Sequence, residues 1–414
     1  MSTTNKFSTP DNVVGNLNGL FKEVYADKLH ELIPEGLKLV NTIKFFAKEK
    51  MGGNLFHQPV ILGMEHGVTF ASSDDDAFNL NPAVAGVIKD AQVRGNPMVM
   101  RSLLGYVAAS RSAGGKNAFM DATKYLVANM LRSMSKKLEI HLLYGQKGYG
   151  EVSAVSGSTI TIATAEWAPG IFAGAEGMPI EIVDATLATS RGEFKIVSVN
   201  METRVITLDA SAALAGVVAT DQVYHKGALG NEFAGIHKIL ENTGTLFNIN
   251  AGTYNLWKGN SYNVSGALSF QKVSKSITRA VEKGLDSEVT LFVNPRGWAD
   301  LLQDLAALRQ YDQSFSSAQL DQGAKAIKFA SQNGDIKIVP SIYVKEGYAY
   351  ALCLEDWMRV GSSDVTFKRP GQGEEFFRDL ENAAAYELRL YTDQAVFCMS
   401  PGKNVILTGI VNVA

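Results

Sequence analysis

The chain has 414 residues, of which 46% are hydrophobic and 20% are charged. This length predicts two to four domains at about 100–200 residues each, and the apolar fraction excludes a disordered chain. Lysine and arginine number 39 against 42 aspartates and glutamates, and the net charge of −3 argues against a dedicated nucleic-acid-binding protein with a strongly basic face. The polar N-terminus lacks an apolar signal segment, and no apolar run is long enough to cross a bilayer, so we expect a soluble protein with no membrane partner.

The chain begins with two segments that predict extensions rather than a packed domain. Residues 1–45 start polar and continue as short amphipathic pieces, which is typical of an arm that needs a partner surface. Residues 51–112 hold two β-rich runs, LFHQPVILGMEHGVTF and PMVMRSLLGYVAASRS, with the acidic stretch SSDDDAFNLNPAVAG between them. We predict that these two runs form a projecting hairpin with an acidic tip. Because an isolated hairpin is marginally stable, it must pack on something else.

Residues 117–144 predict the longest helix, with Asn117 as its N-cap and Gly145 just beyond its end. Apolar residues recur along it at helical spacing, at Phe119, Leu126, Met130, Met134, Leu138 and Leu142. Charged residues lie off this stripe, at Lys124, Arg132, Lys136 and Glu139. We therefore expect this helix to be the backbone of a domain.

In the rest of the chain the predicted secondary structure changes twice. Residues 147–228 contain short alternating β runs and almost no helical signal, which predicts a small β-barrel or sandwich inserted in a larger body. From residue 232 helices and strands alternate again, and Ser269 and Asn294-Pro295 are predicted to begin two of the helices. The C-terminal stretch predicts two strands separated by a turn. The fold class is therefore α+β.

The motifs show no catalytic arrangement. The sequence lacks a P-loop, a G-x-S-x-G elbow and an HExxH motif, and nothing supplies a nucleophile with its base and orienting group. Cys353 and Cys398 lie among apolar residues and predict small buried side chains rather than a disulfide or a zinc site. His57 and His66 lie near one another, and we expect ordinary strand positions for them rather than a metal site. We therefore predict no enzymatic activity, no cofactor and no metal.

The acidic run Asp74, Asp75 and Asp76 is the most distinctive charged motif. It fails the EF-hand pattern, because Phe78 and Asn79 stand where Asp or Asn and Gly are needed. We interpret the run as a solvated loop tip. An ionic contact between subunits and a divalent-ion site are the alternatives.

The order of these parts resembles the major capsid proteins of tailed bacteriophages. The stretches that carry the resemblance are HQPVILGMEHGVTF, FAGIHKILENTG with TYNLWKGN, VTLFVNPRGWADLL and YTDQAVFCMSPGKNVILTGI. They follow one another in order over nearly the whole chain. The resemblance implies an N-arm at 1–50, an E-loop and its base at 51–112, a P-domain spine helix at 113–146, an insertion domain at 147–228, an A-domain at 229–375 and returning P-domain strands at 376–414.

The resemblance also implies a function and partners. The chain is expected to self-assemble into the pentamers and hexamers of an icosahedral phage head that encloses double-stranded DNA by non-specific contact. It would reside in the virion, and in the host cytoplasm during assembly, and would use a portal protein and a separate scaffolding protein. The residues we nominate for contacts between subunits at the E-loop tip are Asp74, Asp75, Asp76, Lys89 and Arg94. Some members crosslink a lysine to an asparagine, for which Lys89 with Asn382 or Asn404 are the candidates.

Two alternatives remain open at this point. The first is a shell protein of a cellular nanocompartment with the same fold, whose partner is a cargo enzyme; the long N-arm and the insertion favour the phage interpretation over it. The second is a carbohydrate-active enzyme with a β accessory module, which predicts a monomer with a carboxylate-lined cleft. The acidic stretch GQGEEFFRDLEN is interpreted as a charged surface loop rather than as such a cleft.

Overall fold

The protein is described here from a computed structural model. This structure describes residues 36–46, 55–74, 77–105, 122–210, 214, 216–304, 327–331, 334–367, 377–380 and 383–413. Most of the predicted N-arm, Asp75, Asp76, Asn382 and the predicted helix start at Asn117 lie outside these residues. Within them, no helix combines the length and the apolar character needed to span a bilayer.

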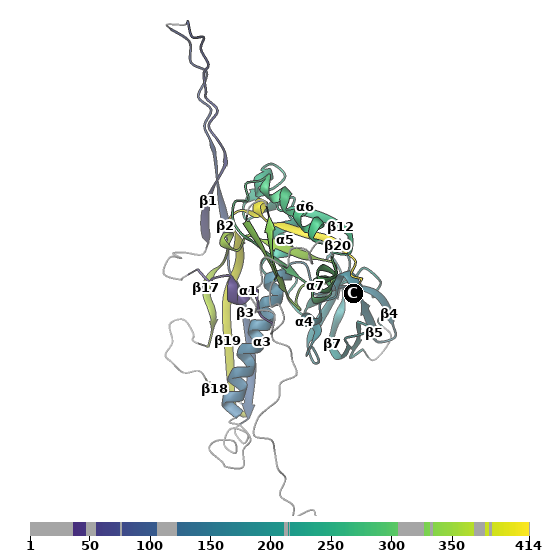
Figure 1. Ribbon diagram of the computed structural model, residues 1–414. Helices are drawn as coiled ribbons and strands as arrows, with labels where there is room; N and C mark the ends of the chain where they lie inside the picture. Colours follow the sequence, from purple (N-terminus) through teal and green to yellow (C-terminus); the bar gives the residue numbers. More distant parts are fainter. Residues whose placement is uncertain are drawn as a thin grey trace, which may run out of the picture.

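A two-stranded hairpin extends far from the rest of the molecule (Figure 1). It consists of β1 (Phe56–Gly63) and β2 (Val87–Val93), which run antiparallel with Phe56 opposite Val93. A projecting hairpin was expected, but its second strand was predicted wrongly. The run that begins at Pro97 forms β3 (Asn96–Gly105) and leaves the hairpin altogether.

The reason for that difference is the packing of β3. This strand pairs over ten residues with β19 (Ala383–Cys398), from Asn96 opposite Gln394 to Gly105 opposite Ala385. Its half-buried Met98 and Met100 contact a cluster formed by the long helix and β19. The strand therefore buries apolar surface in the body that it would leave exposed in a two-stranded hairpin.

The long helix α3 (Ala122–Tyr144) lies along this sheet (Figure 1). The sheet contains β17 (Trp357–Thr366), β19 and β18 (Phe377–Leu380) in that order, with β3 also paired to β19. The predicted apolar stripe is confirmed, since Met130 and Met134 are buried against Leu388 and Leu390.

The helix ends at Tyr144, as predicted, but Gly145 serves another purpose than expected. The left-handed residue after the helix is Gln146, with φ of 62°. A side chain at Gly145 would lie 2.2 Å from the carbonyl oxygen of Phe233. The glycine therefore permits a close approach of two backbones rather than a left-handed turn.

Residues 150–225 contain a closed six-stranded barrel, which resolves the choice between barrel and sandwich. Its strands in spatial order are β4 (Gly150–Ser156), β5 (Thr159–Ile162), β8 (Val205–Leu208), β7 (Ser190–Asn200), β6 (Pro179–Val183) and β9 (Gln222–His225). Between β5 and β6 the chain forms η4 (Thr164–Glu166) and the short helix α4 (Pro169–Phe172). The strands alternate in burial because one face of each points into the barrel.

A second sheet forms the other half of the body. Its six strands in spatial order are β12 (Asn260–Gly266), β20 (Val405–Ile410), β16 (Ala349–Leu352), β13 (Val289–Val293), β15 (Gly334–Pro340) and β14 (Ile327–Ser331). Near it lie α5 (Ile236–Glu241), α6 (Phe270–Val281) and α7 (Pro295–Gln303), with α6 packed against β12 and β20. Shorter elements complete the description: α1 (Leu39–Thr42), β10 (Thr245–Leu246), β11 (Ile249–Asn250), η5 (Asn255–Trp257), η7 (Leu354–Asp356) and η8 (Pro401–Lys403).

The predicted helix starts in this half are confirmed. The Ser269 side chain accepts a hydrogen bond from the Lys272 N–H at the start of α6, and Asn294 caps α7 with Pro295 as its first residue. The predicted boundary at residue 375, between the A-domain and the returning P-domain strands, does not separate the two sheets, however. β17 pairs with β19 on the helix side, whereas β20 belongs to the six-stranded sheet.

Candidate assembly surfaces

The outer part of the hairpin exposes large apolar side chains. Ile61 of β1 is 72% exposed and Phe70, beyond the strand, is 90% exposed. Others on the same hairpin are exposed too, namely Met64, Val68, Phe78, Leu80, Val84 and Ile88. Burying one such side chain contributes roughly 1.5–3 kcal/mol. A run of exposed apolar residues on one projection is therefore a surface suited to contact with another chain.

The base of the hairpin is held by the body. Ala91 and Val93 of β2 are buried in a cluster with Trp257 and Phe397. The rings of Phe56 and Phe397 meet edge to face, with centroids 5.8 Å apart. The hairpin is thus anchored at one end, where Val60 and Leu62 also pack against this cluster, and its far end projects away from the body (Figure 1).

One buried carboxylate holds the short segment 36–46 on the long helix. Glu139 of α3 accepts hydrogen bonds from three successive backbone N–H groups: Lys38 and Leu39 to Oε1, both at 2.9 Å, and Val40 to Oε2 at 2.8 Å. These are the N–H groups at the start of α1, which have no partner within a helix. Burial raises the pKa of Glu139, and the three N–H donors oppose that rise.

Arg359 holds the other end of the segment 36–46. Arg359 of β17 is buried, and its Nε donates to the carbonyl oxygen of Ile43 at 2.9 Å. Its guanidinium also donates to Asp364 and to Gln394, both at 3.0 Å. The backbones of Phe45 and Arg359 form a parallel bridge. Both ends of the segment are therefore tied to the body by buried polar groups.

A buried ion pair joins the barrel to the body. Lys345 Nζ lies 2.6 Å from Glu166 Oε2, and Tyr348 donates to Glu166 Oε1 at 2.7 Å. Lys345 is fully buried, and its backbone N–H donates to the Tyr144 hydroxyl at 2.7 Å. Close by, the Gly347 N–H donates to the carbonyl oxygen of Ala165 at 2.8 Å. The barrel is thus fixed to both the long helix and the six-stranded sheet.

The three nominated contact residues that the structure describes, Asp74, Lys89 and Arg94, do not lie together. Asp74 is exposed in the outer part of the hairpin, whereas Asp75 and Asp76 lie outside the described residues. Lys89 and Arg94 were placed wrongly at the tip: Lys89 stands opposite Val60 within the paired strands, and Arg94 follows β2 at the base. Both side chains are exposed. The cause is the shorter return strand, which ends at Val93.

The structure also places the remaining residues that were considered for chemistry or crosslinking. Cys353 and Cys398 are buried free thiols, as predicted. His57 lies in β1 and its Nδ1 is 2.6 Å from Asp90. Asn404, a candidate for crosslinking, is fully buried and accepts from the Cys353 N–H at 2.8 Å, so its side chain cannot reach another subunit. Among the residues that the structure describes, no three His, Cys, Asp or Glu side chains gather in a way that could hold a metal ion.

The sequence analysis missed the buried charges. Glu139 was noted only as a charged residue off the apolar stripe of the helix, yet it is fully buried. One signal was available, since it stands between Leu138 and Ile140 in a largely apolar run. For Glu166 and Lys345 no local signal exists, because they are 179 residues apart and meet only in the folded chain.

Comparisons with solved structures identify proteins of similar fold. No protein-family model and no curated protein matches the chain. Among solved structures, the cyanophage A-1(L) capsid asymmetric unit matches with a TM-score of 0.58 at 12% identity, over 95% of this chain and 99% of the other. The capsid of a native GTA particle matches with a TM-score of 0.52 at 8% identity, over 96% and 98%. The SrpI encapsulin of Synechococcus elongatus has a TM-score of 0.48 at 7% identity, over 97% and 96%.

The two higher-scoring matches extend over almost the full length of both chains. The likeness therefore does not rest on one short motif. At these identities the likeness concerns the fold alone. The chain has the fold of phage major capsid proteins.

Proposed function

We propose that this protein is the major capsid subunit of a phage head, assembling into the pentamers and hexamers of an icosahedral shell around double-stranded DNA. The observation that carries the proposal is the hairpin, which is anchored at its base by Val93 and Phe397 and exposes apolar side chains such as Phe70 over its length. A contact in which this hairpin lies on a different surface of the next copy is heterologous, and such contacts form a ring when the rotation between copies closes.

Two further features support this proposal. The segment 36–46 is tied down by Glu139 and Arg359, so the chain that precedes it leaves from a fixed point on the body. The near-neutral charge balance of −3 suits a wall that encloses DNA without binding it tightly. A separate scaffolding protein and a portal protein belong to the same proposal, with the virion as the final location and the host cytoplasm as the place of assembly.

The test is removal of residues 73–82 from the full chain. Because the outer hairpin lies outside every buried cluster that the described residues form, we expect the deletion variant to keep the thermal unfolding midpoint of the wild type. We expect closed particles from the wild type by negative-stain microscopy and none from the variant. Val197→Ser is the control, since it changes an exposed apolar residue on the barrel instead.

The outcomes separate the alternatives. Normal particles from the deletion variant would contradict the role given to the hairpin, and a monomeric wild type under all conditions would contradict the shell itself. The contents of purified particles distinguish the two kinds of shell: nuclease-protected DNA supports the phage head, whereas a stoichiometric protein cargo would support a nanocompartment.

A further inference from the structure

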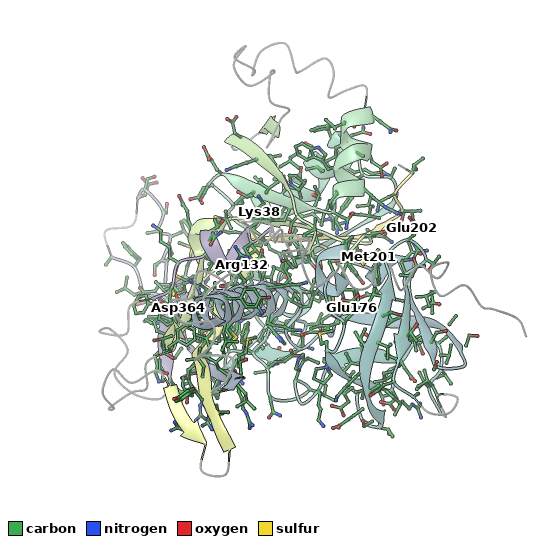
Figure 2. The ribbon with its side chains drawn as sticks, turned by 90° about the horizontal axis from the view of Figure 1, so that it is seen from below. Lys38, Arg132, Glu176, Met201, Glu202 and Asp364 are labelled. Carbon is green, nitrogen blue, oxygen red and sulfur yellow. The ribbon has the colours of Figure 1, made fainter. Side chains whose placement is uncertain are left out.

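Two adjoining cavities lie between the long helix and the barrel. The first, of about 320 Å³, is bounded by Arg132, Lys136 and Lys137 of α3 on one side and by barrel residues 174–179 on the other. In Figure 2 the labelled Arg132 and Glu176 mark these two sides. The second, of about 590 Å³, is bounded by β3 and by residues 226–233. Lys137, Pro179 and His225 line both cavities, so the two spaces meet at these three side chains.

Lys137 occupies the junction without a carboxylate partner. Its Nζ lies 2.6 Å from the Met178 sulfur and 5.6 Å from the centre of the Tyr149 ring. No acidic side chain of the described chain is within ion-pair distance of it. Burial, and then the charge of Lys136, lowers the pKa of Lys137 to about 7. A cation in such surroundings destabilises the fold unless an anion joins it.

Several of the other charges around the cavities have partners, and the Glu176 carboxylate, which also lines the first cavity, acts on Lys136. His141 lies 2.8 Å from Glu232, and Arg101 lies 3.3 Å from Glu387. Lys226 is paired with Glu193 on the barrel. Lys136 donates to the carbonyl oxygen of Ala173. Among the described residues, Lys137 is therefore the lining lysine that has no oxygen partner, and an anion that entered the site could pair with it.

Much of the remaining lining is apolar and adaptable. Four methionines face the two cavities, Met98, Met100, Met134 and Met178. The flexible thioether side chain of methionine fits irregular apolar partners, and it is common at surfaces that bind peptides. Met134 and Met178 are already buried, so a small inorganic anion would pair with Lys137 but would leave the half-buried Met98 and Met100 uncovered. The lining therefore matches an occupant with one carboxylate and neighbouring apolar side chains.

We propose that the two cavities form one binding site for an acidic, apolar peptide segment of a partner protein, whose carboxylate pairs with the Lys137 ammonium and whose apolar side chains contact the methionines. This partner site is separate from the hairpin contact between copies and does not depend on shell assembly. The volumes suit a few side chains of a peptide, since binding cavities for ligands of that size measure about 300–1,000 Å³.

The test uses the full chain and a fluorescein-labelled peptide of alternating leucine and glutamate, followed by fluorescence anisotropy. We expect the wild type to bind it, and Lys137→Met to bind at least about tenfold more weakly, since a charge-assisted contact is lost. Lys275→Met is the matched control, because it removes an exposed lysine from α6, outside both cavities. The same peptide with glutamine in place of glutamate should bind as weakly to the wild type as the acidic peptide binds to Lys137→Met.

Thermal unfolding accompanies the binding assay. Lys137→Met should unfold at the same temperature as the wild type or higher, because it removes a half-buried charge that has no carboxylate partner. Lys137→Gln serves as the second variant if the methionine variant does not fold. Equal binding by the wild type and both variants, or no binding by the wild type, would overturn the proposal. So would inorganic phosphate or a short DNA duplex binding at Lys137 in place of the peptide.

Discussion

The barrel and the hairpin are both β structures, yet the barrel buries large apolar side chains in its interior whereas the outer hairpin exposes them. In the barrel, Ile160, Ile182 and Val223 point inward and are fully buried. In the hairpin, Ile61 and Ile88 point outward and are exposed. A closed barrel pairs all its strand edges and encloses one face, whereas a two-stranded ribbon has two open edges and no enclosed face.

The difference shows where each element gains its stability. The barrel buries its apolar residues within one chain and is fixed to the body by the Glu166–Lys345 pair. The described outer part of the hairpin leaves its apolar side chains exposed, and the hairpin is anchored to the body at its base. The same substitution should therefore have different consequences in the two elements.

The largest expected effect comes from introducing an aspartate into each element. Ile182→Asp places an unpaired carboxylate inside the barrel and should cost more than about 5 kcal/mol of the free energy of unfolding, enough to prevent folding. Ile61→Asp changes a side chain that is 72% exposed and should alter that free energy by less than about 0.5 kcal/mol. Circular dichroism with thermal melting measures both.

Particle formation provides the second half of this comparison. Ile61→Asp should fold normally and yet form few or no particles, because a charge would lie in the contact between copies. A comparable loss of stability in both variants would mean that the hairpin packs on its own body, and the contrast between the two elements would be lost.

Local structure was well predicted where a few neighbouring residues determine it. The stripe through Met130 and Met134 and the caps at Ser269 and Asn294 depend on spacings of a turn or two, so the sequence alone reveals them. The partner of β3 could not be predicted in this way. Alternation marks a strand, but it does not say which distant strand pairs with it, and here that strand begins at Ala383.

The charged groups of the site were predictable only in part. The exposure of Asp74 follows from its polar surroundings, whereas the burial of Glu139 depends on three N–H groups about 100 residues away. Likewise, nothing in the sequence around Lys137 distinguishes it from a surface lysine, because the cavity that it lines is formed by the distant barrel residues. Tertiary packing, rather than any motif, gives these residues their properties.

The next largest effect concerns the junction between barrel and body. Lys345→Met leaves Glu166 buried without its cation and should lower the free energy of unfolding by roughly 3–5 kcal/mol. Urea unfolding measures it. Lys403→Met is the control, because it breaks an exposed pair with Asp286 and should cost less than about 1 kcal/mol. Equal losses in the two variants would show that the buried pair does not hold the barrel in place.

The pH dependence of stability tests the same junction more finely. Burial alone would raise the pKa of Glu166, but Lys345 and the hydrogen bond from Tyr348 outweigh it and lower the pKa from 4.5 to about 2. A carboxyl with a depressed folded pKa stabilises the protein above its unfolded pKa and loses that contribution as the pH falls toward 2. As the pH falls from 4.5 toward 2, the free energy of unfolding of the wild type should decrease by roughly 3 kcal/mol more than that of Glu166→Gln. Parallel acid-unfolding curves would contradict the pairing.

The smallest effect concerns the segment 36–46, which is neither self-enclosed like the barrel nor free like the hairpin. Glu139→Gln keeps one acceptor oxygen but presents an NH₂ group to a backbone donor, so one of the bonds from Lys38, Leu39 and Val40 is lost. We expect a cost of about 1–2 kcal/mol, confined to this segment. Hydrogen exchange of these amides should quicken by about tenfold while the barrel amides stay unchanged. Glu176→Gln, on the barrel side, should leave them unaffected. If the exchange of the three amides did not change, apolar packing of Leu39 and Ile43 alone would hold the segment 36–46 on the long helix.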